Sequence, residues 1–193
     1  VVGPEAPLCA GIVDEFRARG LRIFGPDKQA ARLEGSKSYA KQFMRRYGIP
    51  TAEATAFTDA EAACGYIAER GAPIVVKADG LAAGKGVTVA TTVEEAQQAV
   101  REIFDGAFGS AGNEVLVEEC LEGEEASILA LVDGETIVPL ASSQDHKRAW
   151  DGDRGPNTGG MGAYSPAPVV DEACWARVRT DVLDPFLRGC RGE

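Results

Sequence analysis

Ile74-Val-Val-Lys-Ala-Asp-Gly-Leu-Ala-Ala-Gly-Lys-Gly-Val-Thr-Val-Ala90 is the stretch that decides the fold. Its two ends are short and rich in valine, which predicts two strands, and Lys77 alternates with the valines of the first. The loop between the strands contains Lys85 and the glycines Gly80, Gly84 and Gly86. Because glycine lets the backbone approach a ligand closely and lysine adds positive charge, polyphosphate is the ligand that this loop suits.

The loop is not a P-loop. The pattern G-x-x-x-x-G-K-[ST] fails because the spacing from Gly80 to Gly84 is one residue too short, and Gly86 stands where a hydroxyl is required. A strand on both sides also leaves no helix N-terminus for the phosphates. What remains is a glycine-rich flap that covers phosphates, with Lys77 as a fixed point charge. An ordinary glycine hairpin with surface lysines has the same local sequence and is the alternative.

An acidic segment follows the flap. A strand ends at Glu118-Glu119, a turn surrounds Glu122-Gly123, and a second strand leaves through Ser127 to Val132. Six acidic residues lie between Glu114 and Glu125, and such residues are poor strand formers. Taken alone, this segment favours a solvated sheet edge.

The segment from Ser142 to Pro166 has no helical or alternating periodicity and contains five glycines and two prolines. Its aromatic and apolar residues Trp150, Met161 and Tyr164 argue against disorder. Its polar groups have both signs of charge: Asp145, His146, Lys147, Arg148, Asp151, Asp153, Arg154, Asn157 and Thr158. We interpret it as a substrate loop for a zwitterionic or phosphorylated small molecule, in which His146 makes structural hydrogen bonds.

Six segments carry a further signal when they are taken together: Gly3-Pro-Glu-Ala-Pro-Leu8, Gly25-Pro26, Leu33-Glu-Gly-Ser-Lys37, Lys77 to Gly86, Gly123-Glu-Glu-Ala-Ser127 and Gln144 to Pro166. In this combination the chain resembles the phosphoribosylamine-glycine ligase (glycinamide ribonucleotide synthetase) family of the ATP-grasp superfamily. The segments run from residue 3 to about residue 168, and the stretch from Gly155 to Pro166 is the most selective of them.

The resemblance implies an ATP-dependent ligase of purine biosynthesis that joins glycine to 5-phosphoribosylamine through a glycyl phosphate. A carboxylate resists attack by an amine until phosphorylation gives it a leaving group, and cations must neutralise the phosphoryl group in transfer. The cofactors implied are ATP and Mg²⁺, and the partners are these small molecules together with other domains of the same polypeptide.

The resemblance also implies site residues. Catalytic roles fall to Lys77, Asp145, Lys147 and Arg148. Nucleotide contacts fall to Lys37, Lys77, Gly84, Lys85, Gly86, Val87, Glu118, Glu119, Leu121 and Glu125. In this set the backbone around Glu119 and Leu121 pairs with the adenine edge, and Glu125 accepts from the ribose hydroxyls. Substrate contacts fall to Gly3, Pro4, Glu5, Asp145, Lys147, Arg148, Asn157, Thr158, Gly159, Gly160 and Gly162.

Two family features have no match in this sequence. The chain begins at Val1-Val2, in what reads as mid-strand, and reaches Glu193 without the Glu-x-Asn pair that holds Mg²⁺ in the family. We therefore expect an internal piece of a longer enzyme, with no metal ligands of its own. A nucleotide-binding module without catalysis and another ATP-grasp carboxylate-amine ligase are the alternatives.

The expected fold class is α+β with α/β elements, a partial ATP-grasp fold. Residues 1–25 would end an N-terminal α/β substrate domain, and residues 26–50 would form a helical linker. A small α+β lid of β-α-β-β-α-β order would span 51–119, and the first part of the central domain 120–193, with the substrate loop at 142–168.

Periodicity predicts the elements in more detail. It predicts a helix over 6–19, a strand over 21–24 and helices between 27 and 47. Two lid helices would be capped by Thr58 with Glu61 and by Thr92 with Glu95. A hairpin would turn at Asp133-Gly134, and a helix over 171–189, kinked or ended by Pro185, would bury Val178, Val182 and Phe186. Lys28, Lys41 and Arg45 read as solvated charges on helix faces.

Composition limits the class of protein. The 193 residues are 45% hydrophobic and 26% charged, as in ordinary globular proteins. The net charge of -10 argues against nucleic acid and against an anionic membrane surface as partners. Five cysteines without C-x-x-C spacing, and a single histidine, favour reduced thiols in the cytoplasm over zinc or disulfides.

Overall fold

The structure is a computed structural model that describes residues 1–81, 86–152 and 154–192. It divides into two compact units. The first unit contains Val1–Phe43 and Thr51–Leu121, and the second contains Met44–Pro50 and Glu122–Glu193.

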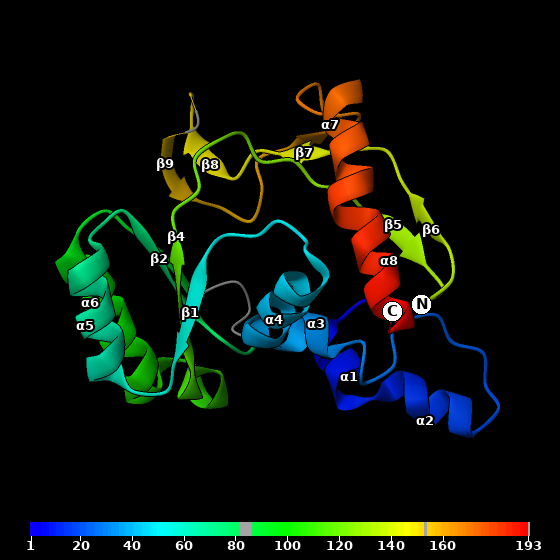
Figure 1. The fold of residues 1–193 in the computed structure, drawn as a ribbon, viewed down its shortest axis with the longest axis horizontal. Coiled ribbons are helices and arrows are strands. Elements are labelled where there is room, and N and C mark those ends of the chain that lie inside the picture. Colours follow the sequence, from blue (N-terminus) through cyan, green and yellow to red (C-terminus); the bar gives the residue numbers. More distant parts are fainter. Residues whose placement is uncertain (82–85, 153, 193) are drawn as a thin grey trace. The chain divides into compact units, whose positions relative to one another are not determined.

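The first unit is built on one antiparallel sheet with the strand order β1-β4-β2-β3 (Figure 1). Its elements follow the chain as β1 (Ala54–Phe57), α5 (Ala60–Arg70), β2 (Ile74–Ala78), β3 (Val87–Ala90), α6 (Val93–Glu102) and β4 (Val115–Glu119). The predicted β-α-β-β-α-β order is therefore confirmed. The valine-rich stretch forms β2 and β3, which pair from Ile74 with Ala90 to Lys77 with Val87.

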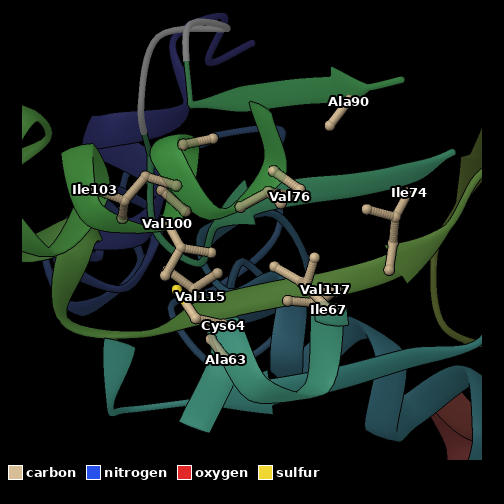
Figure 2. Packing of buried hydrophobic residues seen from close by; sticks show 13 residues of the cluster. Ala63, Cys64, Ile67, Ile74, Val76, Ala90, Val100, Ile103, Val115 and Val117 are labelled. Atoms are coloured by element: carbon tan, nitrogen blue, oxygen red, sulfur yellow. The ribbon is translucent and has the colours of Figure 1, made fainter. Parts of the chain in front are cut away.

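The core of this unit lies between the sheet and helices α5 and α6 (Figure 2). Side chains alternate across a strand, so Val76 points into the core, where it is fully buried, while Lys77 takes the opposite face. Val115 and Val117 of β4 pack beside Val76, and the helices add Ile67 and Val100, among others. The sheet thus has one apolar face for the helices, and its other face carries Lys77 and Glu118 beside the buried Val75 and Leu116.

Two short helical turns connect α6 to β4: η1 (Ile103–Ala107) is a π-helical turn and η2 (Gly109–Asn113) is a 3-10 turn. A Cβ atom added to Gly80 would lie 2.9 Å from the Cβ of Ala111 in η2. The glycine at 80, at the root of the flap, is therefore required for packing.

The N-terminal part differs from its prediction in two places. The expected helix over 6–19 is broken into α1 (Glu5–Ala10) and α2 (Ile12–Ala18), because Gly11 adopts a left-handed φ of 95°. The expected strand over 21–24 is wrong: in the described chain its backbone bonds run from the Val2 N–H to the Phe24 carbonyl and from the Leu21 N–H to the Phe16 carbonyl, and they form no strand ladder. A strand without a neighbouring ladder is not stable. The helices predicted next are present as α3 (Arg32–Gly35) and α4 (Lys37–Tyr47).

Of the two helix caps predicted for the first unit, one is confirmed and one is wrong. Thr92 caps α6 as predicted, because its hydroxyl accepts from the Glu95 N–H. Helix α5 is capped by Asp59 rather than by Thr58, since the Asp59 carboxylate accepts from the Ala62 N–H at 2.8 Å. A carboxylate at this position also interacts favourably with the helix dipole.

The second unit contains the predicted hairpin, formed by β5 (Ala130–Val132) and β6 (Ile137–Pro139). The Asp133 carboxylate accepts from the N–H groups of Glu135 and Thr136, and these bonds lower the pKa of Asp133. Gly134 supplies the positive φ of 98° that the turn needs. Two smaller pairs follow: β7 (Gln144–Asp145) with β10 (Ala163–Tyr164), and β8 (Arg148–Trp150) with β9 (Arg154–Asn157).

The last helical stretch runs through α7 (Glu172–Arg177), the π-helical η3 (Val178–Leu183) and α8 (Asp184–Arg191). Pro185 lies in the first turn of α8 and does not end the helix. The predicted apolar face is wrong in part, because Leu183 and Pro185 are buried while Val182 is exposed. A π-helical turn rotates the following residues away from the 3.6-residue periodicity. In the described ranges no helix combines the length and apolarity needed to cross a membrane.

The difference between the two α5 caps can be measured. Asp59→Ala should lower the free energy of unfolding by about 1 kcal/mol, because it removes the acceptor of an orphan helix N–H. Thr58→Ala, one residue earlier, is the matched control and should change it much less. Urea unfolding of both variants checks this, and equal losses would contradict the capping geometry.

Candidate functional site

The polar face of the sheet carries a buried cluster of charge. Lys77 on β2 and Glu118 on β4 lie diagonally across the two strands, with 2.7 Å between Nζ of Lys77 and Oε2 of Glu118. Glu118 is only 4% exposed. The solvated-edge interpretation of the acidic segment therefore fails for Glu118, whose carboxylate is held inside the first unit.

A second lysine reaches the same carboxylate. The Lys41 Nζ lies 3.5 Å from Oε1 of Glu118 and donates to Oγ1 of Thr51 and to the Ala52 carbonyl. Lys41 is 8% exposed, so its prediction as a solvated charge is wrong, whereas Lys28 and Arg45 are exposed as expected. A buried ammonium requires such partners. The sequence signal that could have found Lys41 is its spacing of four residues from Lys37, which places both on one helix face.

Lys37 begins α4 and reaches the end of β2. Its ammonium donates to the carbonyls of Ala78, Asp79 and Gly80, at 2.9, 3.3 and 2.9 Å. Burial lowers the pKa of Lys37 below its usual value of 10.5; the Asp79 carboxylate opposes this shift and the charge of Lys77 adds to it.

Asp79 ties the start of α4 to the end of β2. Its carboxylate accepts from the Ser38 N–H at 2.6 Å and from the Ser36 hydroxyl at 3.0 Å. The Lys37 side chain bonds back to the strand end, so the connection is made in both directions. The structure thus brings Lys37 and Lys77, the two lysines implied for the phosphates, to the same strand of one sheet.

The flap is described only at its roots. Gly84 and Lys85 lie outside the described residues. Gly86 is buried, and its carbonyl accepts from the Ala78 N–H at 2.8 Å. Val87, the first residue of β3, is 44% exposed.

The implied adenine hinge follows β4. The Glu119 N–H donates to the Glu53 carbonyl, and the Glu119 carboxylate accepts from the Glu53 N–H. Leu121 is exposed and ends the first unit. The backbone N–H of Glu119 is thus already used within the sheet.

Glu125 and the substrate-loop residues for which the resemblance implies catalytic roles lie in the second unit. Nζ of Lys147 is 3.0 Å from Oε1 of Glu125 and 3.8 Å from Oδ2 of Asp145. The hydrogen bond with Glu125 raises the pKa of Lys147. Arg148 donates to the Gly155 carbonyl at 2.8 Å. The structure therefore brings Asp145, Lys147 and Glu125 together.

Backbone hydrogen bonds hold the two arms of the substrate loop side by side. The N–H of Thr158 donates to the Lys147 carbonyl, and that of Met161 donates to the His146 carbonyl. Asn157 pairs with Arg148 in the β8–β9 register, while Gly159, Gly160 and Gly162 are exposed. The His146 ring lies against Tyr164, and the His146 N–H donates to the Gly162 carbonyl. His146 therefore contributes backbone and ring contacts, and the structural hydrogen bonding predicted for its side chain stays a prediction.

The implied loop of Gly3, Pro4 and Glu5 lies in the first unit, at the start of α1. All three residues are exposed, and Pro4 precedes the helix in an extended conformation. This loop therefore belongs to the first unit, whereas the substrate loop belongs to the second.

A metal ion is usually held by several His, Cys, Asp or Glu side chains that lie close together. Within residues 1–81, 86–152 and 154–192 there is no group of three or more His, Cys, Asp or Glu side chains that could hold an ion. Lys37, Lys41 and Lys77 form what we call the lysine cluster. The acidic groups nearest to it, Glu118 and Asp79, already accept from protein donors.

The lysine-bearing antiparallel sheet covered by two helices is part of an ATP-grasp fold, since residues 35–193 match a family model of an ATP-grasp domain. Biotin carboxylase from Campylobacter jejuni has this fold and aligns with a TM-score of 0.72 at 20% identity, over 93% of this chain and 40% of that one. The chain belongs to the phosphoribosylglycinamide synthetase family: residues 35–193 match its ATP-grasp (A) domain, and residues 1–34 match its N domain.

Relatives within the family are similar in sequence and in structure. The phosphoribosylamine-glycine ligase of Vibrio cholerae is 60% identical over the whole chain, which covers 45% of that protein. The crystal structure of the Thermotoga maritima ligase has a TM-score of 0.80 at 38% identity, over 92% of this chain and 45% of that one. The chain therefore spans somewhat less than half the length of these relatives.

The lowered pKa of Lys37 predicts a pH dependence of stability. Between that pKa and 10.5 the unfolded chain holds the Lys37 proton and the folded chain does not, so stability rises with pH. The free energy of unfolding of the wild type, minus that of Lys37→Met, should be flat near neutral pH and should increase as pH approaches 10.5. Denaturant titrations at several pH values measure it. A decrease over the same range would mean that the attraction of Asp79 outweighs burial.

Proposed function

We propose that this chain supplies the ATP-binding part, and part of the substrate site, of a ligase that joins glycine to 5-phosphoribosylamine. The reaction would pass through a glycyl phosphate and give glycinamide ribonucleotide, ADP and phosphate. The observation that carries the proposal is the family match over residues 35–193, which include the lysine cluster and the substrate loop.

Lys37 and Lys77 would hold the phosphates of ATP. Phosphoryl transfer depends on positioning and on neutralising charge on the transferring group, and both lysines lie at the strand that leads into the flap. Gly84, Lys85, Gly86 and Val87 would cover the nucleotide. In the ligand-free structure Lys37 donates to three carbonyls and Lys77 to Glu118, so the phosphates would take over part of these donors.

The adenine would pair with the backbone around Glu119 and Leu121, and the ribose with Glu125. Since the Glu119 N–H is engaged with Glu53, the remaining backbone groups of this segment would serve the base. Glu125 is paired with Lys147, so the ribose hydroxyls would compete with that ion pair.

The substrates would be held by Asp145, Lys147, Arg148, Asn157, Thr158, Gly159, Gly160 and Gly162, with Gly3, Pro4 and Glu5 on the phosphoribosyl side. A lysine beside the two carboxylates of Glu125 and Asp145 is a suitable arrangement for the two charged groups of a zwitterion such as glycine. The hydrogen-bonded arms of the loop support this role, because they fix these side chains on paired backbone.

The proposal also covers the metal ion, the cellular location and the domain division of the chain. Mg²⁺ would accompany ATP, with ligands outside this chain. Five free cysteines support a reducing, cytoplasmic location. The divisions at 50 and 119 are supported by the unit boundaries after Pro50 and Leu121, and the family boundary falls at residue 34 rather than at 25.

Binding of Mg-ATP tests the nucleotide site. Calorimetric titration of the chain should give saturable binding, and Lys77→Met should weaken it by about ten- to a hundredfold, the value of a charge-assisted hydrogen bond. Lys28→Met removes an exposed lysine of the same unit and is the matched control for net charge. Equal affinity of wild type and Lys77→Met would remove Lys77 from the site.

Binding of glycinamide ribonucleotide separates the proposed ligase from its alternatives. With Mg-ADP present, this product should bind to the wild type, and Lys147→Met should weaken it, whereas D-alanine should not bind. Binding of nucleotide without the product would instead support a nucleotide-binding module.

A further inference from the structure

We propose that Lys41 is a positioning residue of the nucleotide site, which acts through Glu118 to keep Lys77 available to a phosphate. This inference concerns the same site and rests on the proposed function. Lys41 itself is turned to protein groups and would not touch the nucleotide: its ammonium donates to Thr51 and Ala52 and lies 3.5 Å from Glu118.

The two lysines share one carboxylate, that of Glu118. Oε1 of Glu118 faces Lys41 and Oε2 accepts from Lys77, so each oxygen has its own cation. Two bonds to the Thr51–Ala52 segment fix the ammonium of Lys41. Lys41 and Glu118 therefore form a fixed pair, and the position of Oε2 fixes where Lys77 rests.

The exposed fraction of each side chain shows which of the three residues has room to move. The side chain of Glu118 is 4% exposed and that of Lys41 is 11% exposed, whereas that of Lys77 is 27% exposed. Lys77 also makes the shorter contact with Glu118 and uses one of its three N–H donors for it, so a phosphate that takes this donor competes with the ion pair. The strength of that ion pair hence limits how well Lys77 can serve a ligand.

The effect of Lys41 on phosphate binding comes from the balance of charge among Lys41, Lys77 and Glu118. Two ammonium groups and one carboxylate leave the cluster with one net positive charge, and Glu118 divides its attraction between two cations. Without Lys41 the cluster is neutral, and Glu118 holds Lys77 in an undivided buried pair. Loss of Lys41 should therefore weaken phosphate binding although Lys41 never meets the phosphate.

A purely structural role for Lys41 predicts something else. If Lys41 only compensated the buried Glu118, its removal would lower stability and would weaken adenosine and ATP alike. The positioning role predicts a loss that depends on the phosphates and that is reversed when the charge of Glu118 is removed as well.

The experiment uses Lys41→Met, the double variant Lys41→Met with Glu118→Gln, and Lys28→Met as the matched change of net charge. Calorimetry gives the ratio of the affinities for Mg-ATP and adenosine. We expect Lys41→Met to lower this ratio by about tenfold, within the range of coupled pairs, and the double variant to restore most of it. The double variant has no unpaired buried charge, so it keeps the test available if Lys41→Met alone fails to fold.

A second readout needs no nucleotide. Pulse acetylation with acetic anhydride, followed by mass spectrometry, reports how freely Lys77 reacts relative to the exposed Lys28. Labelling of Lys77 should slow severalfold in Lys41→Met and exceed the wild-type rate in the double variant. Unchanged labelling or an unchanged affinity ratio in Lys41→Met overturns the inference. Absence of Mg-ATP binding by the wild type, with the expected labelling order, would count against the proposed function and support the charge balance.

Discussion

Burial of the Glu118 carboxylate is the constraint on which the polar face of the first unit depends. A buried carboxylate must be compensated, and here the partners come from two elements far apart in sequence, Lys41 on α4 and Lys77 on β2. The same requirement draws Thr51 and Ala52 into the cluster, because the ammonium of Lys41 must be satisfied in turn. One acidic side chain thus joins a helix, two strands and the segment before β1.

The fold of this unit could largely be read from local sequence. Valine-rich strands around a glycine loop, and the Thr92 cap, are short-range signals, and the structure contains both. The strand expected over 21–24 fails because a strand depends on a neighbour, which local sequence does not reveal. The choice of Asp59 over Thr58 as a cap turns on one residue of backbone geometry, and both side chains can serve.

The site was predictable to a different degree. Lys77 is indicated by the glycine-rich flap and Lys37 by the family resemblance, and the structure brings them to the same strand. Lys41 is missed because a lysine on an amphipathic helix is usually solvated; its spacing from Lys37 is the one local signal, and its tertiary partners show that it is buried. The pairing of Glu125 with Lys147 was likewise invisible, since the two residues lie in separate motifs.

The lysine cluster is a local positive region within a chain of net charge -10. Surface charges act over about 8 Å at physiological ionic strength, so a polyanion interacts with these lysines only once it is near them. The net charge of the chain adds no attraction at longer range. The affinity for a polyanion would then depend on its residence time, set by Lys37 and Lys77, which are only partly buried.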